Sequence, residues 1–145
     1  MVTRRWPDAG RALGSGKMEA TETLPPATMP FLLLIVEPIG QRATRSPEAG
    51  QAAYDEMVRF GQDLQSRGLL IASNSLAATS KGVRVNVREG RTTLVDGPFA
   101  EAKEMVGGFF LIDCETREEA VAIAAQCPAA GWCEVEVRQT GPCFE

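Results

Sequence analysis

The sequence predicts an α+β domain of the ferredoxin-like βαββαβ pattern with an inserted β-hairpin. A continuous apolar run at residues 31–36 indicates a central strand buried on both faces. Two segments, residues 46–68 and 116–128, have helical periodicity between capping and stop signals. Residues 83–95 alternate around a Glu89-Gly90 turn, as a hairpin does. The remaining predicted strands are residues 69–76, 107–113 and 131–138. Without the hairpin, the order of these elements is βαββαβ.

Composition limits the classes of partner. A chain of 145 residues with 44% hydrophobic and 23% charged side chains suits one globular domain. The net charge is −4, and the arginines Arg84, Arg88 and Arg91 gather on the hairpin without aromatic residues between them. The apolar runs are too short to span a bilayer. We therefore expect no direct nucleic-acid binding and no membrane insertion.

Histidine is absent from the sequence, which removes the commonest general base and the commonest metal ligand. The four cysteines, Cys114, Cys127, Cys133 and Cys143, form no Cys-x-x-Cys pair. We expect no metal, no cofactor and free thiols in a reducing, cytoplasmic setting, with a Cys133–Cys143 disulfide as the alternative.

Residues 1–30 are rich in glycine and proline and show no helical or strand period. They predict a poorly ordered tail, or alternatively an interaction arm, ahead of a domain at residues 31–145. The segment has no apolar stretch typical of a secretory signal, and Met18 and Met29 are both plausible start sites.

The first predicted helix has Ser46 as its N-cap, Pro47 at its first position and Gly68 beyond its end. Its buried stripe is expected to comprise Ala53, Met57, Phe60 and Leu64. Tyr54 lies at the edge of this stripe, where it either joins the core or points its hydroxyl into a pocket.

The second predicted helix opens with a capping box from Thr116 to Glu119. Its buried face is expected to comprise Ala120, Ile123, Ala124 and Cys127. In the hairpin, Val83, Val85 and Val87 are expected to be half-buried. The inward face of the last strand stays open, because Trp132 lies on its otherwise polar side.

The turn Asp96-Gly97-Pro98 is the strongest candidate site, because Glu101, Lys103 and Glu104 follow it closely. Such a cluster of ionisable side chains can form a small polar site, but it is also typical of a solvated loop. Asp96 can instead cap its own turn or pair with Lys103.

A ferredoxin-like sheet carries both helices on one face, so the apolar strands need cover on the other face. Pairing of two such sheets supplies this cover, and we expect a homodimer with a small-molecule site between the sheets.

The chain resembles the YCII-related family, in particular its branch named for the Asp-Gly-Pro-Phe motif, over residues 31–139. The matching segments are residues 31–36, the helix from Ser46, 68–70, 83–87, 95–104, 107–112, 118–120, 127–130 and 134–138. The resemblance implies a dimeric α+β barrel and an association with extracytoplasmic-function sigma factors, but the family has no established biochemical function. A His–Asp pair suggested for the wider family does not carry over, because this chain has no histidine to partner Asp96.

Two functions compete. The first is a small dimeric ligand-binding or regulatory protein, favoured by the absence of an activated nucleophile. The alternative is an enzyme acting on a small polar metabolite in the dimer cleft, with Asp96 as acid or base and Lys103 holding an anionic substrate. The candidate pocket residues are Asp96, Pro98, Phe99, Glu101, Lys103 and Tyr54.

Overall fold

The computed structural model describes residues 29–144, so the predicted tail at residues 1–30 lies almost wholly outside it. The strands are β1 (Phe31–Pro38), β2 (Leu70–Ser75), β3 (Val83–Arg88), β4 (Arg91–Asp96), β5 (Glu104–Ile112) and β6 (Glu134–Gln139). The helices are α1 (Pro47–Ser66) and α2 (Arg117–Gln126). Short 3₁₀ turns lie at η1 (Gln41–Thr44), η2 (Thr79–Lys81) and η3 (Pro128–Gly131).

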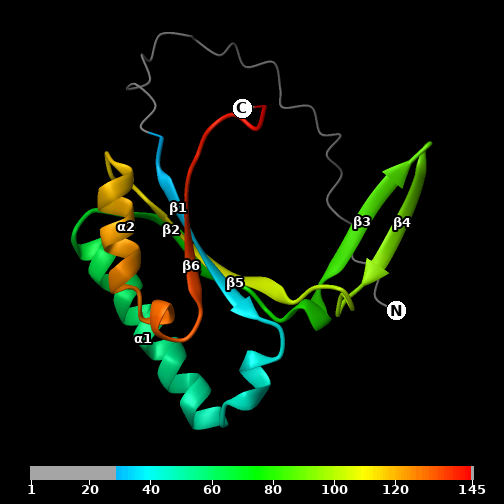
Figure 1. The fold of residues 1–145 in the computed structure, drawn as a ribbon, viewed down its shortest axis with the longest axis horizontal. Coiled ribbons are helices and arrows are strands. Elements are labelled where there is room, and N and C mark those ends of the chain that lie inside the picture. The colour runs from blue at the N-terminus through cyan, green and yellow to red at the C-terminus, as the bar shows by residue number, and fades with distance from the viewer. Residues whose placement is uncertain (1–28, 145) are drawn as a thin grey trace, which may run out of the picture.

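The main sheet has the strand order β2-β5-β1-β6, and every neighbouring pair is antiparallel. Both helices lie on the same side of this sheet (Figure 1). β3 and β4 pair antiparallel in a separate two-stranded sheet. This α+β arrangement of two helices and antiparallel sheets is compatible with the predicted ferredoxin-like fold. Neither helix of the described residues combines the length and apolarity that a bilayer crossing requires.

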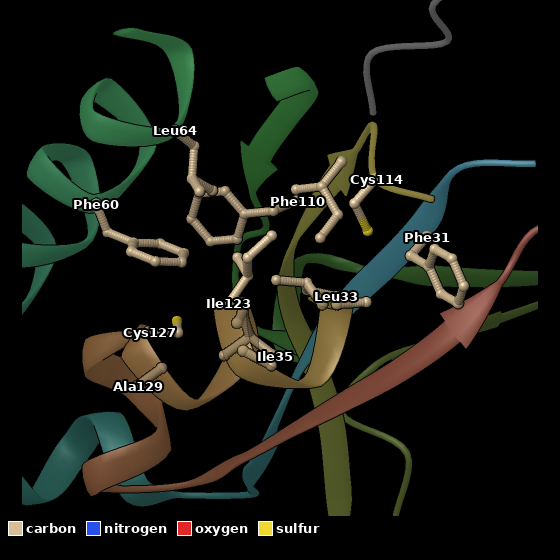
Figure 2. Close-up of a cluster of buried hydrophobic side chains, with 13 residues drawn as sticks. Phe31, Leu33, Ile35, Phe60, Leu64, Phe110, Cys114, Ile123, Cys127 and Ala129 are labelled. Atoms are coloured by element: carbon tan, nitrogen blue, oxygen red, sulfur yellow. The ribbon is translucent and has the colours of Figure 1, made fainter. Parts of the chain in front are cut away.

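The core lies between the helices and the sheet. Figure 2 shows side chains of α1, α2 and β1 meeting there, and Phe60 packs edge-on against Phe110 with ring centroids 5.1 Å apart. The buried side chains are Phe31, Leu33, Ile35, Phe60, Leu64, Phe110, Ile112, Cys114, Ala120, Ile123, Ala124, Cys127 and Ala129. Alternate residues of β1 face this core, and the residues between them are half-buried on the opposite face of the sheet. Burial of β1 is therefore complete on one face only.

Local capping sets the helix bounds that the sequence predicts. The Ser46 hydroxyl accepts a hydrogen bond from the Ala49 N–H at 3.1 Å, and Pro47 is the first residue of α1. Beyond α1, Gly68 adopts a φ of +69°, which ends the helix at little steric cost. The Thr116 hydroxyl caps α2 by accepting from the Glu119 N–H at 3.2 Å.

The open question about the last strand is resolved by its register with β1. Val135 and Val137 lie opposite Ile35 and Leu33 and pack against the core. Trp132 precedes the strand and also packs against the core, so its position in the alternation has no bearing on the strand's faces.

The prediction that Val83, Val85 and Val87 are half-buried is wrong. Their exposed fractions are 51%, 61% and 54%, because β3 pairs only with β4 and no other layer of residues 29–144 covers the apolar face of this hairpin. Strand alternation correctly indicates one face, but it does not show whether another element covers that face.

Candidate functional site

A cleft of about 590 Å³ lies between α1 and the helix-facing side of the sheet. Its apolar wall comes from Ile35, Met57 and Phe110, together with Trp132, which directly follows η3. Its polar lining comes from Tyr54, Gln62 and Gln65 of α1, Ser73, Asn74 and Ser75 of β2, and Glu37, Arg42 and Arg45. A cleft of this size with a mostly apolar lining and a few polar groups is typical of a small-molecule site.

Glu37 and Arg42 form an ion pair in the lining of this cleft. Glu37 is only 7% exposed, and its Oε1 lies 2.5 Å from Arg42 Nε. The same guanidinium donates from Nη1 to the carbonyl oxygen of Leu76 at 2.8 Å and from Nη2 to that of Gly107 at 3.4 Å. Arg42 therefore links η1 to the end of β2 and to β5, and its donors are largely occupied by protein acceptors.

Gly107 makes room for this ion pair. The register between β1 and β5 shifts between Ile35 and Val36, which leaves Gly107 unmatched in the ladder. A Cβ atom on Gly107 would overlap the Glu37 carboxylate and lie 2.9 Å from Arg42 Nη2. Only glycine therefore lets the carboxylate lie against the strand backbone.

Arg45 is the second cation of the cleft. Its guanidinium carbon lies 5.5 Å from the centroid of the Trp132 ring, which is within the range of a cation–π interaction. Within residues 29–144, Arg45 forms no ion pair. Its donors thus remain available to an acidic group that enters the cleft.

Three of the cysteines, Cys114, Cys127 and Cys133, have environments that disfavour the thiolate. Burial raises the pKa of Cys114 and Cys127, and burial together with the nearby Glu37 charge raises the pKa of Cys133 to about 11. All four cysteines are free thiols, so the alternative Cys133–Cys143 disulfide is not formed.

The structure places one predicted site residue in the cleft and five elsewhere. Tyr54 lines the cleft from α1. Asp96, Pro98, Phe99, Glu101 and Lys103 lie at the root of the β3–β4 hairpin, outside the cleft lining. All but Phe99 are exposed. The structure therefore does not bring Tyr54 together with the Asp-Gly-Pro-Phe turn within one chain.

Phe99 has a partner at this root. The guanidinium carbon of Arg84 lies 3.8 Å from the centroid of its ring. Both side chains border a second hollow of about 350 Å³, which also includes Lys81. The turn thus contributes to a smaller basic and aromatic surface.

Backbone contacts hold the turn in place. The Gly97 N–H donates to the carbonyl oxygen of Gly82 at 2.9 Å, and a Cβ atom on Gly97 would overlap the carbonyl oxygen of Thr79. No ion pair joins Asp96 to Lys103 among the described residues. The glycine of the motif is therefore explained by close packing of the turn against η2.

Glu37, Arg42 and Arg45 were not among the predicted site residues, because they lie between the predicted strand at residues 31–36 and the predicted helix from Ser46. Two signals could have found the ion pair. Glu37 continues the alternation of the buried residues Leu33 and Ile35, and a Gly-Gly pair opens an apolar strand at residue 107. Glycine inside a strand often marks a bulge or a close approach by another group.

The structure is that of a small α+β protein with a partly enclosed cleft whose mostly apolar lining includes several polar groups. The family model for the YCII-related domain matches residues 29–140, and the chain belongs to this family. The chain is also similar to an uncharacterised protein of Rhizobium meliloti (strain 1021), with 39% identity over 84 residues. That match covers 58% of this chain and 60% of the relative, so the chain spans about three fifths of the relative's length.

Proposed function

We propose that this protein binds a small organic acid in the cleft between α1 and the sheet. The observation that carries the proposal is that two arginines line one cleft and that only one of them has an ion-pair partner among residues 29–144. Arg42 is held by Glu37 and by two backbone carbonyl groups, whereas Arg45 lines the same cleft with no ion-pair partner among residues 29–144. A guanidinium placed over an aromatic ring binds carboxylate or phosphate groups in a fixed orientation.

The rest of the lining suits the remainder of such a molecule. Met57 and Phe110 offer apolar surface, while Ser73, Asn74 and Gln62 offer hydroxyl and amide groups. Burial of an apolar portion supplies most of the affinity, and the few polar groups select orientation and identity. The ligand class is therefore a compact molecule with an acidic group and an apolar portion.

A homodimer accompanies this proposal. The sheet face away from the helices carries Leu32, Leu34, Val36, Phe109 and Leu111, which are half-buried in the single chain. A contiguous apolar surface of this kind favours association, and a second copy offers an identical surface across a twofold axis. Such pairing of the sheets would form the dimeric α+β barrel that the resemblance implies.

Thermal unfolding with simple probes tests the ligand class. Benzoate and phenyl phosphate join an acidic group to an apolar ring, and benzyl alcohol is the neutral control. Both anions should raise the melting temperature of the wild type, because a ligand of the folded state stabilises it. Benzyl alcohol should raise it less.

The matched variants are Arg45→Gln, in the cleft, and Arg59→Gln, on α1 outside the cleft lining. Each removes one positive charge. Arg45→Gln should weaken binding of the anions by at least about 10-fold, while Arg59→Gln should leave it unchanged. Equal binding to both variants, or no binding of either anion to the wild type, would overturn the proposal.

Two further predictions rest on the resemblance. Association with an extracytoplasmic-function sigma factor predicts that such a factor co-purifies with the tagged protein, and its absence from the eluate would contradict the association.

The alternative enzyme, with Asp96 as acid or base, predicts that Asp96→Asn abolishes turnover of a metabolite that the wild type converts.

A further inference from the structure

The β3–β4 hairpin has one apolar face and one basic face. Residues that lie opposite each other in an antiparallel pair share a face, so the register groups Val83, Val85 and Val87 with Thr92, Leu94 and, at the base of the hairpin, Asp96. The other face carries Arg84, Arg88 and Arg91 with Asn86, Thr93 and Val95. The hairpin is thus an amphipathic element whose mostly apolar side is covered by no other layer of residues 29–144.

The apolar face extends along most of the length of the hairpin. Its four large side chains, Val83, Val85, Val87 and Leu94, are between 51% and 63% exposed. The hairpin makes few contacts with other elements, and Figure 1 shows it standing away from the main sheet on the side without helices. A two-stranded sheet alone in water is marginally stable, and most native hairpins gain stability by packing on another surface.

The root of the hairpin is nevertheless fixed. Gly97 packs without a side chain against Thr79, and Arg84 lies over the Phe99 ring. An element that is anchored at its base and bare along its length is suited to reach another molecule. From this base the hairpin extends on the side of the main sheet that lacks helices (Figure 1).

The charges of the hairpin complement those of the rest of the chain. Residues 83–96 contain three arginine side chains and two carboxylates, a net charge of +1. The remainder of residues 29–144 contains eight basic and thirteen acidic side chains, a net charge of −5. A second copy of this chain therefore presents an acidic body to a basic hairpin, which favours their association.

We propose that the hairpin is an arm that packs its apolar face against a second copy of this chain, along the border of the bare sheet faces that pair in the homodimer. This inference rests on the proposed homodimer and identifies the segment that joins the two copies. Around a twofold axis the contact is made twice, with each arm on the other copy.

Two double variants with the same change in charge test the arm. Val85→Glu with Leu94→Glu alters a directly opposed pair on the apolar face, and Asn86→Glu with Thr93→Glu alters the adjacent opposed pair on the basic face. Both change the net charge of residues 83–96 from +1 to −1, so any difference between them reports the apolar contact. Dimer dissociation is measured by sedimentation equilibrium, with circular dichroism of each variant as the check of folding.

The apolar-face variant should weaken the dimer by at least about 10-fold relative to the basic-face variant, because its carboxylates must lose water in the interface. An unchanged dimer in both variants would overturn the arm and leave the homodimer standing. Equal weakening in both would also overturn the apolar contact. A wild type that is monomeric at every concentration would overturn the arm and the homodimer together.

Hydrogen exchange of the wild type gives a second readout that needs no substitution. Amides of residues 83–96 should exchange more slowly at concentrations above the dimer dissociation constant than below it. Amides of α2 serve as the internal reference. Exchange of the hairpin that does not respond to dimer dissociation would contradict the proposal.

Discussion

The cleft and the root of the hairpin share two structural features, yet only the cleft is partly enclosed by a helix. Each has a glycine whose Cβ would overlap a neighbour: Gly107 beside Glu37, and Gly97 beside Thr79. Each has an arginine over an aromatic ring: Arg45 on Trp132, and Arg84 on Phe99. At the cleft, α1 lies over these groups, whereas no layer of the described part of the chain covers the hairpin root.

This difference shows that a dense local motif and a binding site are separate properties. Turn chemistry at residues 96–99 fixes how the hairpin leaves the body. Enclosure of the cleft depends on α1, which is remote in the sequence from this turn. The following predictions test this division between an enclosed region and a projecting one, from the largest expected effect to the smallest.

Gly97→Ala should have the largest effect. The added methyl group overlaps the carbonyl oxygen of Thr79, a backbone atom that moves aside only if η2 shifts, so the unfolding free energy should fall by about 2–3 kcal/mol. Gly107→Ala meets the ends of the Glu37 and Arg42 side chains, which can rotate away from the methyl group, and it should cost less, about 1–2 kcal/mol. Urea unfolding followed by circular dichroism measures both.

Gly50→Ala in α1 is the control for the glycine series. A Cβ atom there has nothing within 4 Å, and alanine in a helix should stabilise the chain by about 0.4–1 kcal/mol. Gly107→Ala as stable as the wild type would contradict the role given to this glycine.

Glu37→Gln should have the next largest effect. The change removes the charge that faces the Arg42 guanidinium, and the loss should be about 1–2 kcal/mol because Arg42 is partly in water. The control is Asp63→Asn, which alters an exposed pair with Arg67 on α1 and should cost under about 0.5 kcal/mol. Equal losses in the two variants, by urea unfolding, would show that the Glu37 pair behaves as a surface pair.

Stability should fall at alkaline pH because the half-buried Cys133 thiol ionises more readily in the unfolded chain than in the folded one. The pKa of Cys133 is raised from 9.0 to about 11 by burial and by the Glu37 charge, so the folded state favours the protonated thiol. The stabilisation is fully present below pH 9 and is lost as the pH rises towards 11. The melting temperature should therefore decline over this interval.

Cys133→Ser should make that decline shallower, because serine does not ionise in this range. Cys143→Ser, at an exposed position, is the control and should retain the slope of the wild type. Identical slopes in the wild type and both variants would mean that the Cys133 thiol is hydrated as in the unfolded chain.

Asp96→Asn should have the smallest effect on stability. Asp96 is exposed at the end of β4, so the change should be under about 0.5 kcal/mol, and binding of benzoate and phenyl phosphate should stay the same. Loss of anion binding in this variant would return the ligand site to the Asp-Gly-Pro-Phe turn.

Much of the fold was predictable because its signals are local. Ser46 and Thr116 cap their helices as expected, and the predicted stripe residues Phe60 and Leu64 are buried. Ala120, Ile123, Ala124 and Cys127 face the core as periodicity indicates. Capping and periodicity depend on residues within a few positions of each other, which a sequence displays directly.

Burial of the hairpin and the position of the cleft were not predictable in the same way. Val83 and Val85 alternate like half-buried residues, but whether a layer covers them depends on the rest of the fold. Glu37 meets Gly107 only because β1 and β5 are neighbours with a shifted register. Contacts of this kind join segments about 70 residues apart, and no local pattern specifies them.

Chemical-shift mapping with phenyl phosphate is the most direct test of where the ligand binds. Titration of the isotopically labelled wild type should shift the Trp132 indole N–H and the amides of α1 and β2 that line the cleft. Amides of residues 96–103 should stay unperturbed. Saturable shifts confined to residues 96–103, with the cleft silent, would contradict the assignment of the site to the cleft and restore it to the turn.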